Sequence, residues 1–138
     1  MTFIKNFFKD YFHKYFSAKK ENLKKVRGFL QKILNKKKVN NKKISVIKMC
    51  VIEHCENIIR HSGADGFYTG IKIDHSCILV KIIDKGKKFN IKEYKLPDIK
   101  NRIKNGQGGK MGLHIILALS KKIVYKREKG YNINTFVF

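Results

Sequence analysis

The spacing of apolar residues predicts two amphipathic helices in the first half of the chain. Apolar side chains recur every three or four residues between positions 23 and 34, so we expect a helix over 17–35 with Ser17 as its N-cap. The same kind of spacing returns after a lysine-rich connector and predicts a second helix over 43–60. Ser62 and Gly63 then supply the stop signal of that helix.

Short runs rich in Ile, Val and aromatic residues predict four β-strands after the helices. The runs 67–73 and 76–83 are separated by a short polar turn. The runs 123–126 and 133–138 flank Lys129-Gly130 and predict a hairpin. Helices followed by strands of this kind favour a domain in which helices pack on a sheet.

Three further segments carry weaker patterns. Residues 84–110 are polar and predict a long loop, of the kind that is usually functional in a compact domain, and 112–122 has helical spacing. Residues 1–16 alternate aromatic residues and lysines at helical spacing, which suits a membrane surface or a partner. The interpretation we favour makes 11–16 an edge strand and 1–10 a flexible leader.

Composition fits one folded domain and narrows the class of protein. The chain has 138 residues, of which 43% are hydrophobic, which is enough for one core and too little for two. The net charge of +22 comes mostly from lysines scattered along the whole length. No cluster of Arg, Asn and Gln with interleaved aromatic residues accompanies it, so the charge does not by itself indicate nucleic-acid binding.

Cysteine usage and hydropathy bear on the compartment. The three cysteines contain no CxxC pair, so neither a disulfide framework nor a zinc site is indicated. No apolar run approaches the length that spans a bilayer, and no cleavage site follows an apolar stretch at the N-terminus. We therefore expect a cytoplasmic protein that does not bind membranes.

The second predicted helix carries candidate chemistry. Glu53, Asn57 and His61 follow one another at four-residue steps on one face, about 12 Å along the axis. A carboxamide oxygen suits magnesium, and a carboxylate one turn away can accept a proton from an attacking hydroxyl. A solvated helix face explains the same pattern equally well.

An acidic turn and a glycine loop follow downstream. Asp84 ends an apolar strand, where a carboxylate can accept a hydrogen bond from an exocyclic amine. Gly86 allows the backbone to approach a flat ring closely. The alternative is an ordinary turn between a strand and a loop. Thr135, in the last strand, has a hydroxyl that can reach a phosphate. A glycine loop opens the 112–122 helix, so its amides can hold phosphate oxygens. Its residues are Gly108, Gly109, Lys110, Met111, Gly112 and Leu113.

Together, in this order and at these intervals, the motifs resemble the ATP-binding domain shared by gyrase, the Hsp90 chaperone, histidine kinases and MutL. More narrowly, the chain is similar to the small bacterial anti-sigma factors with serine kinase activity, the RsbW and SpoIIAB type. The resemblance covers about residues 11–138. It implies an α/β (α+β) two-layer sandwich, the Bergerat fold, in which helices cover one face of a mixed sheet.

The resemblance also implies cofactors, partners and roles. ATP and Mg²⁺ would be bound, with Glu53 as general base, Asn57 and His61 in the magnesium box, and Asp84 with Gly86 reading adenine. The glycine loop from Gly108 to Leu113 would close over the phosphates, and Thr135 would belong to the closing strand. The partners would be a sigma factor and an anti-anti-sigma protein that is phosphorylated on serine, and such proteins usually act as homodimers.

Two departures from the family pattern keep a second hypothesis open. Lys88 and Lys110 stand where the family usually has glycine. A non-catalytic interaction module of the same fold would tolerate both lysines. A third hypothesis uses residues 1–16 and the lysine excess to bind an anionic surface such as a membrane or DNA.

Overall fold

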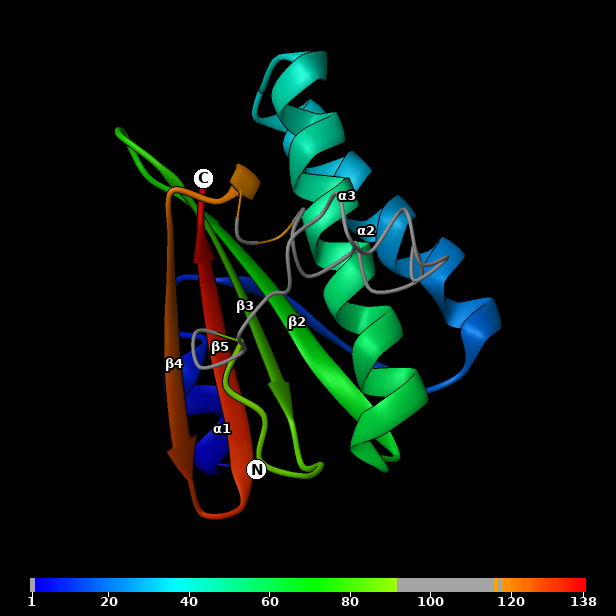
Figure 1. Ribbon diagram of the computed structural model, residues 1–138. Helices are drawn as coiled ribbons and strands as arrows, with labels where there is room; N and C mark the ends of the chain where they lie inside the picture. Colours follow the sequence, from blue (N-terminus) through cyan, green and yellow to red (C-terminus); the bar gives the residue numbers. More distant parts are fainter. Residues whose placement is uncertain (1, 92–115, 117) are drawn as a thin grey trace.

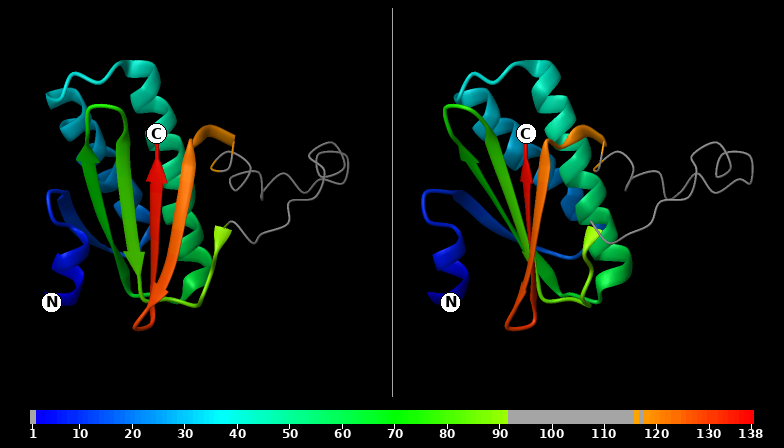
Figure 2. Two further views of the ribbon diagram at one scale, coloured as in Figure 1. Left: turned by 90° about the vertical axis from the view of Figure 1, so that its left-hand side faces the viewer. Right: turned by 60° about the vertical axis from the view of Figure 1, so that its left-hand side comes forward.

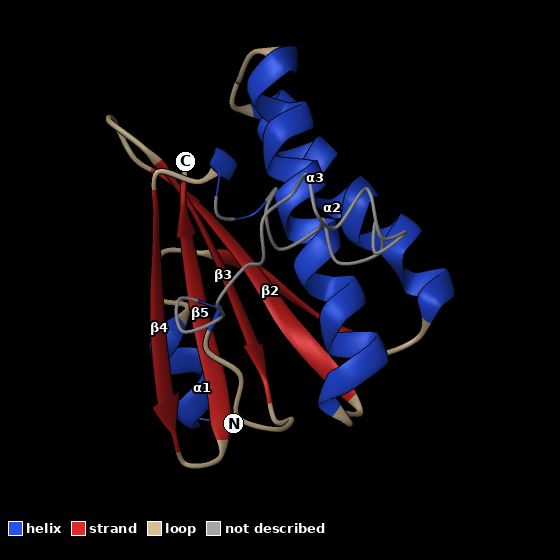
Figure 3. Cartoon of the chain, in the orientation of Figure 1, coloured by secondary structure: helices blue, strands red, loops and turns tan. Residues whose placement is uncertain are grey.

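The computed structural model describes residues 2–91, 116 and 118–138, and it has two main layers (Figures 1 and 3). One layer is a five-stranded sheet and the other consists of α2 and α3, which cover one of its faces. A shorter helix, α1, lies on the opposite face (Figure 2). The elements are α1 (Thr2–Phe7), β1 (Phe12–Ser17), α2 (Leu23–Lys36), α3 (Asn41–Asn57), β2 (Gly66–Ile73), β3 (Ile78–Asp84), β4 (Lys122–Glu128) and β5 (Tyr131–Val137).

The sheet has the strand order β1-β2-β3-β5-β4, and each of its four pairings is antiparallel. The two-layer α+β class is confirmed, but the expected mixed sheet is wrong for the strands that the structure describes. Strand β4 begins at the end of the sheet where β3 begins, so β4 runs in the direction of β3. The tight turn at Gly130, with φ of 82°, then places β5 between them.

The two long helices form where the pattern predicts them, with different caps. Ser17 is not an N-cap, because it is the last residue of β1 and its hydroxyl accepts a hydrogen bond from Asn22 Nδ2 at 2.7 Å. Helix α3 begins after Asn40, whose side chain accepts from Lys43 N at 2.8 Å. A π turn, Ile58–Ser62, extends α3 and ends at Gly63, with φ of 73°, as the stop signal predicts.

The main core lies between the sheet and the helices α2 and α3. Side chains alternate along each strand, and in β3 Val80 and Ile82 face the helices whereas Ile83 faces α1. The expected helix 112–122 lies partly outside the described residues, which include only 116 and 118–122 of it. Its predicted end is wrong, because Lys122 already belongs to β4.

The edge strand expected at 11–16 is present as β1, paired along its length with β2. The segment before it is a helix rather than a flexible leader. Ile4 and Phe8 are buried against Ile83 and Ile133 on the second face of the sheet. The apolar face of α1 is therefore core, which leaves it little to offer a membrane. No described helix is long and apolar enough to cross one.

Candidate functional site

Helix α3 turns one face to the core and a polar face away from it. Glu53 and Asn57 both lie within α3 and are half-buried. Burial raises the pKa of Glu53, neighbouring Glu56 acts in the same direction, and Arg60 opposes them. A carboxylate with a raised pKa is a stronger proton acceptor than an ordinary glutamate. His61 lies in the π turn after the helix and is exposed.

Asp84 lies at the end of β3 on the same side of the sheet as the helices. Its side chain is 3% exposed, and Oδ1 accepts from Gly86 N at 2.9 Å and Asn132 Nδ2 at 3.1 Å. Burial raises the pKa of Asp84, while these hydrogen bonds and the charge of Arg127 lower it. Within the part of the chain that the structure describes, both hydrogen bonds end on Oδ1.

The end of α3 and the Asp84 turn are joined by direct contacts. Lys87 N donates to Ser62 O at 2.9 Å, and Ser62 Oγ donates to Ile58 O at 2.7 Å. Gly86 packs so closely on this turn that an added Cβ would lie 2.5 Å from Ser62 Cβ. The residue that follows His61 therefore contacts the Asp84 turn, although more than twenty residues separate His61 from Asp84 in the sequence.

Asn132 holds this site together and was missed by the sequence analysis. It pairs with Asp84 across β3 and β5. Besides its bond to Asp84, its Nδ2 donates to Lys87 O at 2.7 Å, and its Oδ1 accepts from Tyr125 OH at 2.7 Å and from Arg127 Nη1 at 3.0 Å. The only available signal was the period of two in the last strand, combined with the hairpin turn that sets the register.

Thr135 lies on the wrong face for the role that the resemblance gave it. It pairs with Lys81, whose ammonium group donates to Phe7 O on the α1 side of the sheet. Because side chains alternate, its neighbour Asn134 faces the helices instead. Asn134 is 1% exposed, so the residue next to Thr135 in the sequence is a buried polar residue on the face that turns toward the helices.

Several buried polar atoms of α3 and of the sheet have no hydrogen-bond partner among the described residues. They are Asn57 Nδ2, Thr69 Oγ1, both side-chain polar atoms of Asn134 and both ring nitrogens of His54. Thr69 and Asn134 share one row of the sheet, since each pairs with Ile82. Buried polar groups are normally satisfied, so atoms left over beside a candidate site suit a polar ligand or ordered water.

The donor set fits a nucleotide with magnesium better than a metal cage made by protein alone. No three His, Cys, Asp or Glu side chains gather as a metal cluster in residues 2–91, 116 and 118–138. Magnesium usually takes one or two protein oxygens and completes its shell with water and phosphates. The side-chain oxygen of Asn57 would supply one such ligand. The predicted phosphate loop, Gly108 to Leu113, lies outside the described residues.

The fold is an α+β domain in which helices cover one face of an antiparallel sheet (Figure 1), and buried polar residues lie on that face. The chain belongs to the histidine kinase-like ATPase domain family, whose model matches residues 16–138. An ATPase domain implies ATP as the ligand. None of the curated protein sequences compared with the chain is significantly similar to it.

Solved structures show the same fold at low sequence identity. One contains the RsbU and RsbW domains of a Mycobacterium tuberculosis protein; it is 17% identical, has a TM-score of 0.67, and the match covers 94% of this chain and 32% of that one. Another is the SiaB–SiaC complex from Pseudomonas aeruginosa; it is 12% identical, has a TM-score of 0.71, and the match covers 99% of this chain and 95% of that one. This chain thus spans about a third of the M. tuberculosis chain.

Proposed function

We propose that this protein is an ATP-dependent serine/threonine kinase of the anti-sigma type. In this proposal it phosphorylates a small anti-anti-sigma protein and sequesters a sigma factor, acting in the cytoplasm as a homodimer. The observation that best supports the kinase is the contact between the π turn that follows α3 and the Asp84 turn, made by Ser62, Gly86 and Lys87. One of the similar structures is a complex of two proteins, which supports a protein partner.

The residues of the site divide the work of phosphoryl transfer. Glu53 accepts the proton of the acceptor hydroxyl, and its raised pKa favours that step. The side-chain oxygen of Asn57 is a ligand for magnesium, and Asp84 Oδ2 accepts from the exocyclic amine of adenine. Asn134 takes the place that the sequence assigned to Thr135 and supplies a buried donor. When bound, MgATP supplies the phosphoryl group and neutralises its developing charge.

Glu53→Gln tests the kinase. The variant keeps the shape of the side chain and removes the base, so we expect it to bind MgATP as the wild type does and to lose phosphoryl transfer by about a hundredfold or more. Calorimetry measures the binding, and radiolabelled ATP measures transfer to proteins copurified from the native cell. Transfer at the wild-type rate would remove Glu53 from this role.

The non-catalytic module remains the second candidate, and one feature favours it. Lys88 is exposed immediately after the Asp84 turn, where the family usually has glycine. Calorimetry with MgATP separates the two candidates, because a module that has lost its ligand gives no heat of binding. Asp84→Asn provides the control: in a nucleotide-binding protein it should weaken ATP binding without unfolding the domain.

A further inference from the structure

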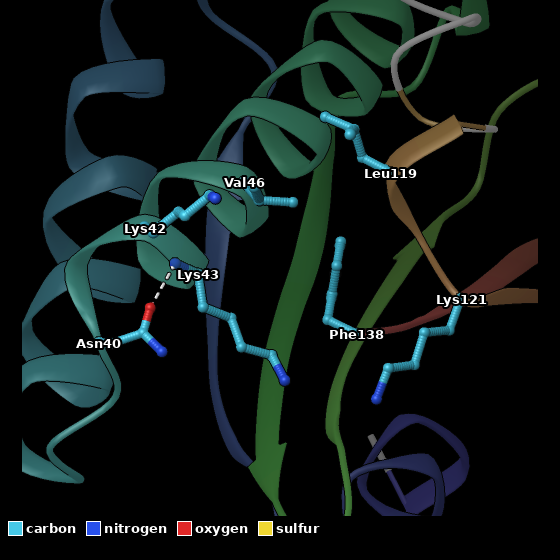
Figure 4. Close-up of a pocket in the computed structure, with 7 residues that line it drawn as sticks. All are labelled: Asn40, Lys42, Lys43, Val46, Leu119, Lys121 and Phe138. Atoms are coloured by element: carbon cyan, nitrogen blue, oxygen red, sulfur yellow. Dashed lines mark hydrogen bonds between the residues drawn. The ribbon is translucent and has the colours of Figure 1, made fainter.

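A groove of about 270 Å³ lies where the first turns of α3 meet the end of the sheet that holds Phe138 (Figure 4). It is far from the Asp84 turn. Phe138 exchanges two backbone hydrogen bonds with Ile78, at the start of β3, whereas Asp84 ends that strand. Six residues of extended strand separate the two ends by roughly 20 Å.

The floor of the groove is apolar. Val46, Leu119 and Phe138 line it from three different segments of the chain. Leu119 is 42% exposed, and covering its apolar side chain would be favourable in free energy. Met49, 48% exposed, lies one turn further along the same face of α3 and extends the apolar strip beyond the groove.

The rim of the groove is positively charged. Lys42, Lys43 and Lys121 line it, and none of the three forms an ion pair with a carboxylate in the described part of the chain. The first turn of α3 holds no acidic residue. Asn40 is already used by its own helix as the N-cap (Figure 4). The groove therefore presents an apolar floor with unpaired cations on both sides.

We propose that this groove docks an acidic segment of a partner protein, with a large apolar side chain on the floor and carboxylates beside the lysines. Charge complementarity and the apolar floor select this occupant together. Nucleic acid fits less well, because stacking needs an exposed aromatic face and Phe138 is only 3% exposed.

The docking goes beyond the proposed kinase and does not depend on it. Lys42, Val46, Met49 and Glu53 follow at helical spacing, so the groove shares one face of α3 with the candidate base. Eleven residues of helix separate Lys42 from Glu53 by about 16 Å. A partner held in the groove would thus lie on the face of α3 that also holds Glu53, whether or not phosphate is transferred.

Peptide binding to the full chain tests the docking. The probe is a short fluorescein-labelled peptide in which Leu and Phe alternate with Glu, followed by anisotropy and by amide NMR shifts. We expect binding with shifts at Val46, Leu119 and Lys121. Lys42→Glu combined with Lys121→Glu should weaken binding about tenfold. Leu119→Ser, which changes an exposed side chain, should weaken it by a similar factor.

Matched controls distinguish this groove from general charge attraction. Lys24→Glu with Lys25→Glu makes the same change of charge on the exposed face of α2 and should leave affinity within about a factor of two, because distant charges are screened. The proposal is overturned if this control loses affinity equally, if the peptide does not bind, or if a peptide with Ser in place of Leu and Phe binds as well. Groove variants that instead reduce binding of an oligo-dT strand would assign the surface to nucleic acid.

Discussion

His54→Leu removes a buried imidazole whose protonation should limit acid stability. The ring is 2% exposed and packs edge-on against Phe136, with centroids 5.1 Å apart. Burial lowers the pKa of His54 from 6.5 to about 4. The folded protein thus keeps a neutral ring at pH values where the unfolded chain is already protonated. The difference between 6.5 and about 4 corresponds to roughly 3 kcal/mol of folding free energy.

The sign of the effect follows from which state binds the proton more tightly. The unfolded chain does, so stability contributed by the neutral ring is fully present above about pH 6.5 and is lost as the pH falls to about 4. Urea unfolding followed by circular dichroism across this range measures it. The wild type should lose roughly 3 kcal/mol more than His54→Leu. Near neutral pH the variant should be equally or more stable, because it removes two unsatisfied nitrogens.

His75→Leu is the control for this prediction, because His75 lies in an exposed turn. It should retain the wild-type dependence of stability on pH. If the curves for His54→Leu and the wild type run parallel between about pH 7 and 4, the ring does not titrate as its burial implies, and the reasoning fails.

Two further predictions use contacts within the site. Gly86→Ala should lower the free energy of unfolding by about 1–3 kcal/mol, because the added Cβ would overlap the turn that ends α3. Gly28→Ala has open space around it and should raise the free energy of unfolding by up to about 1 kcal/mol. Urea unfolding measures both variants, and equal effects would contradict the close packing at Gly86. The acidic limb of the pH dependence of phosphoryl transfer should move to lower pH in Glu56→Gln, because Glu56 raises the pKa of Glu53. The same limb should move to higher pH in Arg60→Gln, because Arg60 lowers that pKa. If both variants shift the limb in the same direction, Glu53 is excluded as the base.

The helices and hairpins were predictable because their signals are local. The apolar period of α3, the Gly63 stop and the turn at Gly130 each depend on a few neighbouring residues. The N-cap of α2 was not predictable in the same way. Ser17 is a good capping residue, but pairing of β1 with β2 extends the strand through Ser17, and a tertiary contact overrides the local preference.

Within the candidate site, the positions of Asp84 and Gly86 were predictable, and the orientation of the closing strand was not. Asp84 and Gly86 lie together because both are at the end of one strand, which the sequence shows directly. Whether Asn134 or Thr135 faces the helices depends on the register of β5 against β3, and a shift by one residue exchanges the two faces. The hairpin turn sets the register of β5 against β4 but gives no direct signal for its register against β3, so Asn132 and its network emerged only from the structure.

The unpaired polar atoms bear on whether this site binds a ligand or merely fills a core. Each buried atom without a partner costs about 1–3 kcal/mol, which an apolar side chain of similar shape would avoid. Thr69 and Asn134 lie in one row of the sheet, on the face that the helices cover, and Asn57 of α3 also has a buried nitrogen without a partner among the described residues. Asp84, by contrast, is fixed by its own turn and by Asn132. Among the described residues, a polar layer that is fixed at one end and unsatisfied elsewhere suits a polar ligand or ordered water better than a purely structural core.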